Sequence, residues 1–269
     1  MRRRSSRWTL LHLPTSAPAG SLLRREEHRY QYLPVFYIGT SKMSGKMTKK
    51  QEPWTKEKVQ RYAEVMGKKR SKWIYASFTK KIMKNLELLE KNLTNLTILD
   101  LGTGPGFLSI DLNKLLSDAR IIGVDLSSEM LKLARSNALK AGMSNYETKL
   151  GRVEEIPLES NSIDLVVSQN SLREWTDQKR GFFEIFRVLK PGGMLILTDL
   201  NKGCPRWKFR LFSFLIRIAV GRRSAKDHIG SYKNAFTFDK VIDLSRDAGF
   251  DEIAGEGGGL ELFICAQKI

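Results

Sequence analysis

The sequence predicts an α/β domain in which a mostly parallel sheet is covered by helices on both faces. Two patterns predict this class: short apolar segments alternate with helical segments between residues 97 and 200, and two closely spaced apolar segments end the chain. Alternating strands and helices form right-handed crossovers, which give parallel strands. The closing pair, joined by a glycine-rich turn, predicts an antiparallel edge. A chain of 269 residues is long enough for such a domain with additions.

The individual elements follow from apolar spacing and from turn residues. Helices are expected before and within the sheet at residues 54–66, 73–93, 107–116, 127–142 and 176–190. Ser127 is the expected N-cap of its helix, and Gly142 is the expected C-terminal stop. Strands are expected at residues 97–101, 120–126, 146–150, 162–169 and 193–200. After them come a basic, aromatic helix, a second helix and two strands, at residues 204–223, 237–250, 251–255 and 260–269.

A glycine-rich loop, residues 102–106 of "TILDLGTGPGFLSIDL", follows the first of these strands. Ligands bind at this edge of a parallel sheet. A dinucleotide fingerprint would place a third glycine at position 107, where Phe107 stands, and the Lys-Ser/Thr ending of a phosphate-binding loop is missing. There is no lysine or arginine between residues 97 and 113, and Asp100 precedes the loop. This pattern favours a ligand with a cationic end over one with phosphates.

An acidic residue, Asp125, ends the second strand 23 residues after Gly102. A carboxylate at this place can accept both hydroxyls of a ribose. S-adenosylmethionine fits both features, with its ribose on Asp125 and its amino-acid end at the loop and at Asp100. The alternative is a tight turn with an aspartate that caps the following helix.

Five segments resemble the class I S-adenosylmethionine-dependent methyltransferases, and the branch with the ubiquinone and menaquinone methyltransferases is the most similar. They are "LDLGTGPG", "GVDLSSEML", "GRVEEIPLESNSIDLVVSQNSL", "EIFRVLKPGGMLILTDL" and "SRDAGF" with the two strands after it. The resemblance extends from about residue 70 to the end of the chain. It implies a Rossmann-like seven-stranded sheet in the order 3-2-1-4-5-7-6, with the last strand antiparallel. It also implies S-adenosylmethionine as methyl donor and S-adenosylhomocysteine as product.

The expected cofactor-binding residues combine the loop, the end of the second strand and the segments that match the family. They are Asp100, Gly102, Thr103, Gly104, Gly106, Asp125, Leu126, Met130, Arg152, Val153 and Ser168. The family usually has an acidic residue where this chain has Arg152, and an arginine cannot accept a hydrogen bond from the adenine amino group. We therefore expect adenine to be held by the backbone near Val153, by stacking or by Glu154. Leu126 or Met130 either packs on adenine or belongs to the core.

The methyl acceptor is expected beside "SQNSLREW", residues 168–175, after the fourth strand. The candidate catalytic residues are Asn170, Arg173 and Tyr232, and Trp175 is a further residue of the acceptor side. Arg173 either pairs with an acidic substrate or lies on the surface beside Glu174. The prolines typical of enzymes that methylate nucleobase amino groups are absent, and no cysteine is present for attack on a pyrimidine ring. We expect no metal site.

The basic, aromatic segment at residues 206–223 has a broad apolar face flanked by arginines. It favours a lid helix packed on the domain with its arginines in water. The alternatives are an interfacial helix that admits a lipid-like acceptor from a membrane surface and a dimer contact. The sequence does not predict the oligomeric state.

The net charge of +17 is concentrated in the first 50 residues, which hold 11 Lys or Arg and two Glu, a net charge of +9. The rest of the chain carries +8, so binding to nucleic acid is not expected. Residues 1–50 are expected to be a disordered leader or to precede the true start at Met43 or Met47. A cytoplasmic protein is expected, unless residues 1–42 are an organelle transit peptide. Residues 51–95 should form helices that cover the active site, and residues 96–269 the cofactor-binding domain, with an insertion at about 204–235.

These observations predict methyl transfer from S-adenosylmethionine to a small-molecule or lipid/quinone-like acceptor by in-line SN2 displacement. Two alternatives remain. One is an RNA or protein methyltransferase that uses the basic surface, and the other is a non-catalytic accessory subunit that binds S-adenosylmethionine.

Overall fold

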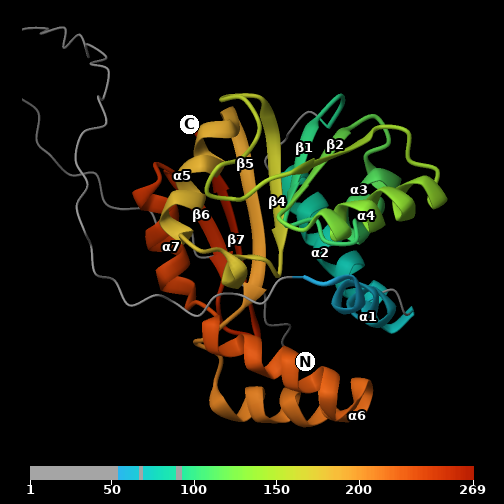
Figure 1. Ribbon diagram of the computed structural model, residues 1–269. Coiled ribbons are helices and arrows are strands. Elements are labelled where there is room, and N and C mark those ends of the chain that lie inside the picture. The colour runs from blue at the N-terminus through green and yellow to red at the C-terminus, as the bar shows by residue number, and fades with distance from the viewer. Residues whose placement is uncertain (1–53, 67–68, 89–92) are drawn as a thin grey trace, which may run out of the picture. The chain divides into compact units, whose positions relative to one another are not determined.

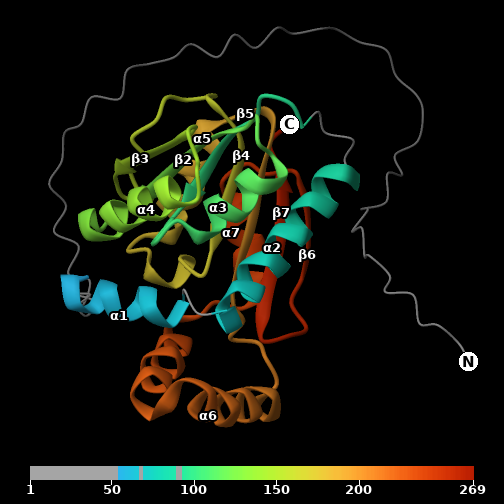
Figure 2. The same cartoon turned by 90° about the vertical axis from the view of Figure 1, so that its right-hand side faces the viewer.

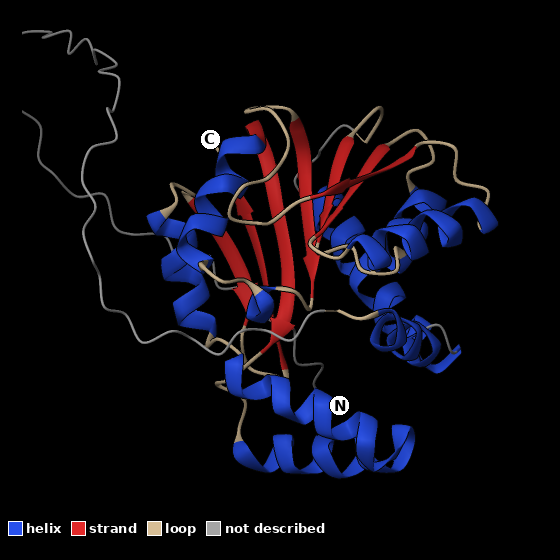
Figure 3. Ribbon diagram, in the orientation of Figure 1, coloured by secondary structure: helices blue, strands red, loops and turns tan. Residues whose placement is uncertain are grey.

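The strands form one seven-stranded sheet in the order β3-β2-β1-β4-β5-β7-β6 in the computed structural model (Figures 1 and 3). β1 to β5 pair in parallel, and β7 is antiparallel to both of its neighbours, β5 and β6. The predicted fold class, strand order and antiparallel last strand are confirmed. The strands are β1 Thr97–Leu101, β2 Arg120–Asp125, β3 Tyr146–Leu150, β4 Ile163–Gln169, β5 Leu189–Leu200, β6 Glu252–Glu256 and β7 Glu261–Gln267.

The structure describes residues 54–66, 69–88 and 93–269, all within one unit, residues 53–269. The leader predicted at residues 1–50 lies outside the described residues. The helices are α1 Lys56–Met66, α2 Lys69–Leu88, α3 Phe107–Leu115, α4 Ser128–Lys140, α5 Gln178–Val188, α6 Arg206–Ser231 and α7 Phe238–Asp247. Two short 3₁₀ helices, Leu172–Glu174 and Tyr232–Asn234, follow β4 and α6.

The sheet has a separate apolar core on each face, because successive strand side chains point to opposite sides. On one face, Ile98 and Val167 pack with residues of α2 and α3, such as Ile82 and Leu112. On the other face, Leu99 and Val166 pack with residues of α5 and α7. Figures 1 and 3 show these helix layers on either side of the strands. The strand ends that carry polar residues are held between two rigid layers.

Local capping signals in the sequence are realised in the structure. The Ser127 hydroxyl accepts a hydrogen bond from the Met130 amide, and Gly142 has a φ of 75° just after α4. These contacts satisfy helix-end groups that would otherwise lack partners. Asp177 and Thr237 cap α5 and α7 in the same way.

Several predicted boundaries are wrong, and α2, for example, begins at Lys69 rather than at residue 73. β5 begins at Leu189 rather than at residue 193, because Leu189 pairs with Ile163 and the backbone of residues 192–193 bonds to Lys268. α5 consequently ends at Val188. Helical backbone continues through Gly221 to Ser231, well past residue 223, and α6 folds back so that Phe209 stacks on its C-cap residue Tyr232 (Figure 1).

Candidate functional site

The loop after β1 is shaped by glycines and by two hydrogen bonds to β2. The amides of Gly102 and Thr103 both donate to the carbonyl oxygen of Val124, at 2.8 and 3.1 Å. Gly102 has a φ of 75°, and a Cβ atom on it would lie 2.5 Å from the Cβ of Ser171. Gly104 also has a positive φ, 52°, but a Cβ there would meet nothing within 4 Å. Gly102 is therefore required by packing against the protein, and Gly104 borders open space, where a ligand can approach the backbone.

Asp125 links this loop to the start of α4. Its Oδ2 accepts from the Gly104 amide at 2.9 Å, and its Oδ1 accepts from the Ser127 amide at 2.8 Å. Burial raises the pKa of Asp125, and the hydrogen bonds from the backbone partly oppose this rise. Each carboxylate oxygen has a second lone pair, so the residue retains the capacity to accept two hydroxyl groups. Asp125 thus holds the turn before α4, whose N-cap is Ser127 and not Asp125, and the same residue suits a ribose.

Asp100 lies beneath the loop and is only 2% exposed. Its Oδ2 accepts hydrogen bonds from the Ser109 and Thr103 hydroxyls, at 2.6 and 2.8 Å. Burial raises the pKa of Asp100 to about 6, although both hydroxyl donors lower it. The Thr103 hydroxyl also lies 3.0 Å from the hydroxyl of Tyr146 on β3. Sequence reasoning missed Tyr146, because only the pairing of β3 with β2 brings it to the loop.

Ser168 supports the loop from β4. It is fully buried, and its hydroxyl donates to the carbonyl oxygen of Leu101 at 2.9 Å. The Ser171 hydroxyl lies 2.6 Å from the Ser168 hydroxyl and accepts a hydrogen bond from the indole N–H of Trp175 at 3.1 Å. These contacts place Ser168 and Trp175 in the scaffold of the loop. Direct contact of Ser168 with the cofactor stays a prediction.

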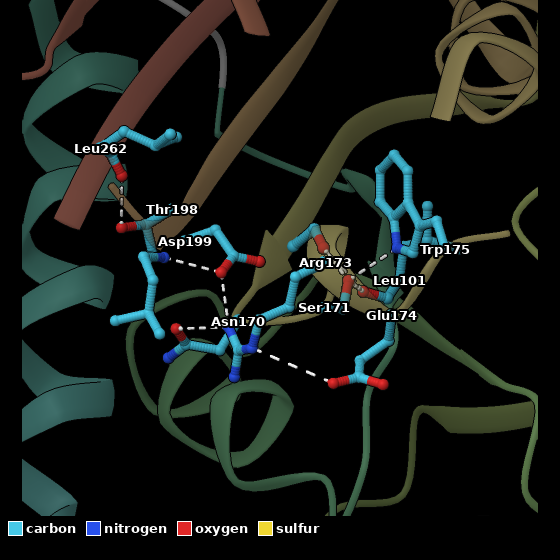
Figure 4. A network of polar contacts seen from close by, with 11 residues as sticks. Leu101, Asn170, Ser171, Arg173, Glu174, Trp175, Thr198, Asp199 and Leu262 are labelled. Carbon is cyan, nitrogen blue, oxygen red and sulfur yellow. Dashed lines mark hydrogen bonds and ion pairs between the residues drawn. The ribbon is translucent and has the colours of Figure 1, made fainter. Parts of the chain in front are cut away.

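The acceptor-side candidates meet a residue of β5 that the sequence did not single out. Arg173 forms an ion pair with Asp199, donating from Nη1 to Oδ1, and its Nη1 also lies 3.4 Å from Asn170 Oδ1 (Figure 4). Glu174 is 4.0 Å from Arg173 Nε. The Arg173 side chain is 15% exposed and that of Asp199 is 1% exposed. Arg173 is therefore neither a surface residue nor a free cation for an acidic substrate.

The environment of this pair has two further features. Asp199 Oδ2 is buried and has no hydrogen-bond partner among the described residues. Asn170 has a φ of 60°, and its amide donates to the Thr198 carbonyl at 2.9 Å, which fixes the turn after β4. A buried carboxylate oxygen without a partner is costly, so a donor from a bound molecule would stabilise it. The catalytic roles of Asn170 and Arg173 stay predictions.

The residues expected at the adenine end differ in solvent exposure. Leu126 is 54% exposed, whereas Met130 is buried at 3%. The Glu154 carboxylate accepts from the Thr176 and Asp177 amides, at 2.6 and 3.0 Å, so it is already engaged at the start of α5. The Leu126 side chain has the free surface that packing on a base requires.

Arg152 and Val153 belong to the same end. The Arg152 side chain donates to the Thr176 hydroxyl at 2.9 Å and pairs with Glu154 at 3.4 Å. Val153 is buried at 8%. The backbone near Val153 therefore remains the candidate for holding adenine, and its contact with the base stays a prediction.

Two tyrosines from the N-terminal helices lie beside this group of residues. Tyr62 of α1 and Tyr75 of α2 share a hydrogen bond, and burial raises the pKa of both phenols. Tyr62 also feels the charges of Arg173 and Asp125, and Tyr75 feels that of Asp100. The aromatic pair thus lies near the acceptor side, at Arg173, and near the cofactor side, at Asp100 and Asp125.

Tyr232 is placed elsewhere. Its hydroxyl donates to the Lys202 carbonyl at 3.0 Å, and its ring stacks on Phe209 with centroids 3.8 Å apart. The hydrogen bond attaches the end of α6 to the connection after β5, and the ring stack joins the two ends of α6. The predicted catalytic role of Tyr232 has no support from them and stays a prediction.

A groove of about 860 Å³ is lined by none of the glycine-loop residues 102–106, although its lining includes Arg152 of the predicted adenine end. Its lining includes Thr97 and Arg120, at the amino ends of β1 and β2, and Pro157 in the connection from β3 to β4. Ligands of parallel sheets bind at the opposite, carboxyl ends of the strands. We therefore assign the candidate site to the loop and not to this groove.

Comparisons with known proteins agree with the geometry of the loop. A family model described as a methyltransferase domain matches residues 92–227. The chain is 32% identical over 180 residues to the demethylmenaquinone methyltransferase of Lactococcus lactis, covering 62% of this chain and 71% of that protein. It is 34% identical over 110 residues to the arsenite methyltransferase of Halobacterium salinarum, covering 40% of this chain and 28% of the relative.

A solved structure supports the fold as well. A Methanococcus maripaludis protein assigned as an S-adenosylmethionine-dependent methyltransferase superposes with a TM-score of 0.61 and 25% identity. The match covers 83% of this chain and 97% of that one. The chain with the predicted strand order and glycine loop is therefore similar to methyltransferases both in sequence and in fold.

Proposed function

The chain belongs to the methyltransferase-domain family, and from this premise we propose that it transfers a methyl group from S-adenosylmethionine to a neutral, hydrophobic small molecule of the quinol type. The observation that carries the donor side is the Asp125 carboxylate, which holds Gly104 and Ser127 and has acceptor capacity for a ribose. The similarity to a demethylmenaquinone methyltransferase favours the acceptor class.

The charge pattern at the end of β4 and β5 supports a neutral acceptor. Arg173 is the cation that an acidic substrate would need, and Asp199 neutralises it in the protein. An anionic acceptor would have to separate a buried ion pair, and this costs several kcal/mol. A phenolic hydroxyl, by contrast, can donate to the buried Asp199 oxygen that has no partner in the described structure.

The residues of the site bind and orient the reactants. S-adenosylmethionine, when bound, supplies an electrophilic methyl group on a sulfonium, which a nucleophile displaces in line. Asp100 would face its ammonium and Asp125 its ribose, while Tyr62 and Tyr75 would cover the bound cofactor from the N-terminal helices. Alignment of this kind supplies most of the rate enhancement for a displacement that needs no covalent intermediate. The carboxylate of Asp199 would accept the proton of a hydroxyl-bearing acceptor.

A transfer assay tests the proposal. The intact protein would be incubated with S-adenosylmethionine labelled in the methyl group and with a neutral naphthoquinol, and the organic phase would be counted. We expect label in the quinol and at least about tenfold less in a carboxylated naphthol of the same ring size. Arg173 already pairs with Asp199, so it is not available to bind the carboxylate of that acceptor.

The alternatives predict different products. Label that enters only RNA or protein would contradict the quinol proposal and favour a macromolecular substrate. Cofactor binding without label in any acceptor, including a cell extract, would favour the accessory-subunit alternative.

A further inference from the structure

Helix α6 exposes an apolar stripe. Its members are Trp207, Leu211, Phe214, Leu215 and Ile218, which are 64, 51, 61, 53 and 69% exposed. They recur at the spacing of one helix face and fall within an arc of about 100°. Scattered exposed apolar residues are common on proteins, but a contiguous apolar stripe marks an interaction surface.

The stripe is not the face by which the first half of α6 packs on the protein. Phe209 stacks on Tyr232, which is the C-cap of α6 itself, so the end of α6 folds back onto its first half. Ser213, on the same side as Phe209, is only 9% exposed. These two residues lie on the opposite side of the helix from the stripe, so the packed face and the stripe are separate surfaces. Lys208 Nζ also donates to the Gly258 carbonyl at 3.2 Å, which holds the start of α6 against the turn between β6 and β7.

The charge around the stripe has one sign. Between residues 200 and 226 the sequence has eight Lys or Arg and no Asp or Glu. Arg206, Arg210 and Arg217 are exposed and follow one side of the stripe. An apolar stripe flanked by cations is complementary to an anionic bilayer surface, with its acyl chains below and its negative headgroups above.

α6 also lies at the functional end of the molecule. It follows β5, which ends beside the Asp199–Arg173 pair. In Figures 1 and 2 it lies beyond the carboxyl ends of the strands, apart from the helices that cover the sheet faces. Asn201 fixes the connection, because its side-chain amide donates to the carbonyls of Gly257 and Gly259.

Among the described residues, no helix combines the length and apolar character that crossing a bilayer demands.

We propose that the first half of α6, residues 206–218, is an interfacial helix that docks the protein on an anionic lipid bilayer, parallel to its surface. Trp207, Leu211 and Phe214 enter the boundary between headgroups and acyl chains, and the flanking arginines contact the headgroups. This orientation presents the carboxyl edge of the sheet to the membrane. Its use, delivery of a hydrophobic acceptor from the bilayer, rests on the proposed function, whereas the docking itself does not.

Vesicle flotation of the full-length protein tests the docking. Vesicles of phosphatidylcholine with about one quarter phosphatidylglycerol would be compared with vesicles of phosphatidylcholine alone. We expect binding to the anionic vesicles that is at least about tenfold tighter and that weakens as salt rises. A blue shift of tryptophan fluorescence on binding should disappear in Trp207→Phe, although the four other tryptophans remain.

Matched variants separate the stripe from general hydrophobicity. Replacing Trp207, Leu211 and Phe214 together by Ser should reduce vesicle binding at least about tenfold, because each buried apolar side chain contributes to interfacial binding. Leu139→Ser removes a 78% exposed apolar side chain on α4 and should leave vesicle binding unchanged. Replacing the three arginines together by Gln should remove the preference for anionic vesicles. Unchanged cofactor affinity and circular dichroism would show that each variant is folded.

Three outcomes would overturn the docking proposal. The first is absence of vesicle binding, or equal binding by the triple Ser variant. The second is a dimer in sedimentation that the triple Ser variant converts to monomer, which makes the stripe a contact between two copies. The third is salt-dependent RNA binding through the three arginines without vesicle binding. Vesicle binding without methyl transfer to a quinol would instead count against the proposed function alone.

Discussion

The donor end and the acceptor end of this molecule are built in different ways. At the donor end, the loop at residues 102–106 is held by backbone amides, by Asp100 and by Asp125. At the acceptor end, the ion pair between Arg173 and Asp199 and the exposed stripe of α6 are made by side chains from separate elements. The donor loop needs a positive φ at Gly102 and Gly104 and the carboxylates of Asp100 and Asp125, so it tolerates few substitutions. The side-chain contacts of the acceptor end can be exchanged one at a time. A family can therefore keep one donor and vary the acceptor.

The largest effect is expected at Gly102. In Gly102→Ala the new Cβ would lie 2.5 Å from the Cβ of Ser171, and the φ of 75° disfavours any side chain. We expect a loss of about 2–4 kcal/mol in the free energy of unfolding. Urea denaturation measures it, with Gly258→Ala as the control, because a Cβ there meets nothing within 4 Å. Equal stability of the two variants would contradict the tight contact between the loop and Ser171.

The second effect concerns the buried ion pair. Arg173→Met leaves the Asp199 carboxylate buried without its cation, so we expect a loss of about 3 kcal/mol in the free energy of unfolding. Adding Asp199→Leu should restore most of this loss, because no unpaired charge then remains. Thermal unfolding of both single variants and the double variant measures the coupling. Additive losses would show that the two residues do not act as a pair.

The third effect is a pH dependence at the donor end. Burial raises the pKa of Asp100 to about 6, so the carboxyl is largely protonated at pH 5. A cationic ligand requires the ionised form and must release the proton there, so affinity for S-adenosylmethionine should fall about tenfold per pH unit below 6. Between pH 7 and about 7.5 the affinity should not change with pH. Asp100→Asn should bind weakly and show no such slope, and a slope that persists would assign the titration to another group.

The smallest effect is expected at Arg152. Its side chain is about half exposed and bonds to Thr176 and Glu154, so Arg152→Ala should change the affinity for S-adenosylmethionine less than about threefold. Leu126→Ala should weaken the affinity more, because that exposed side chain has the surface for adenine. Calorimetric titration of both variants compares them. A larger loss at Arg152 would show that its side chain touches the cofactor.

The parts of the structure that follow from local patterns could be predicted from the sequence. The run of apolar residues in β1, the loop glycines and the Ser127 cap each depend on neighbours within a few residues. Asp125 could be placed because strand ends in a parallel sheet meet at one edge. The start of β5 does not follow from local pattern, because it depends on hydrogen bonds to Lys268, far along the chain.

The missed site residues share a different cause. Tyr146, Asp199 and Tyr62 occur in segments whose local pattern indicates only a strand or a helix. Each reaches the site through tertiary pairing: β3 beside β2, β5 beside β4, and α1 beside α2. The sequence predicts Arg173 to be either a partner of an acidic substrate or a surface cation, and only the pairing of β4 with β5 shows its partner, Asp199. Sequence spacing specifies the donor end far better than the acceptor end.

Calorimetric titration of the intact protein with S-adenosylmethionine tests the central claim most directly. We expect a dissociation constant in the roughly micromolar range, and a loss of about 100-fold in Asp125→Ala, because its hydrogen bonds to Gly104, Ser127 and the ribose are charge-assisted. Asp118→Ala, an exposed acid beyond α3, should bind like the native protein. No binding by the native protein, or equal binding by Asp125→Ala, would contradict the assignment of this loop as the donor site.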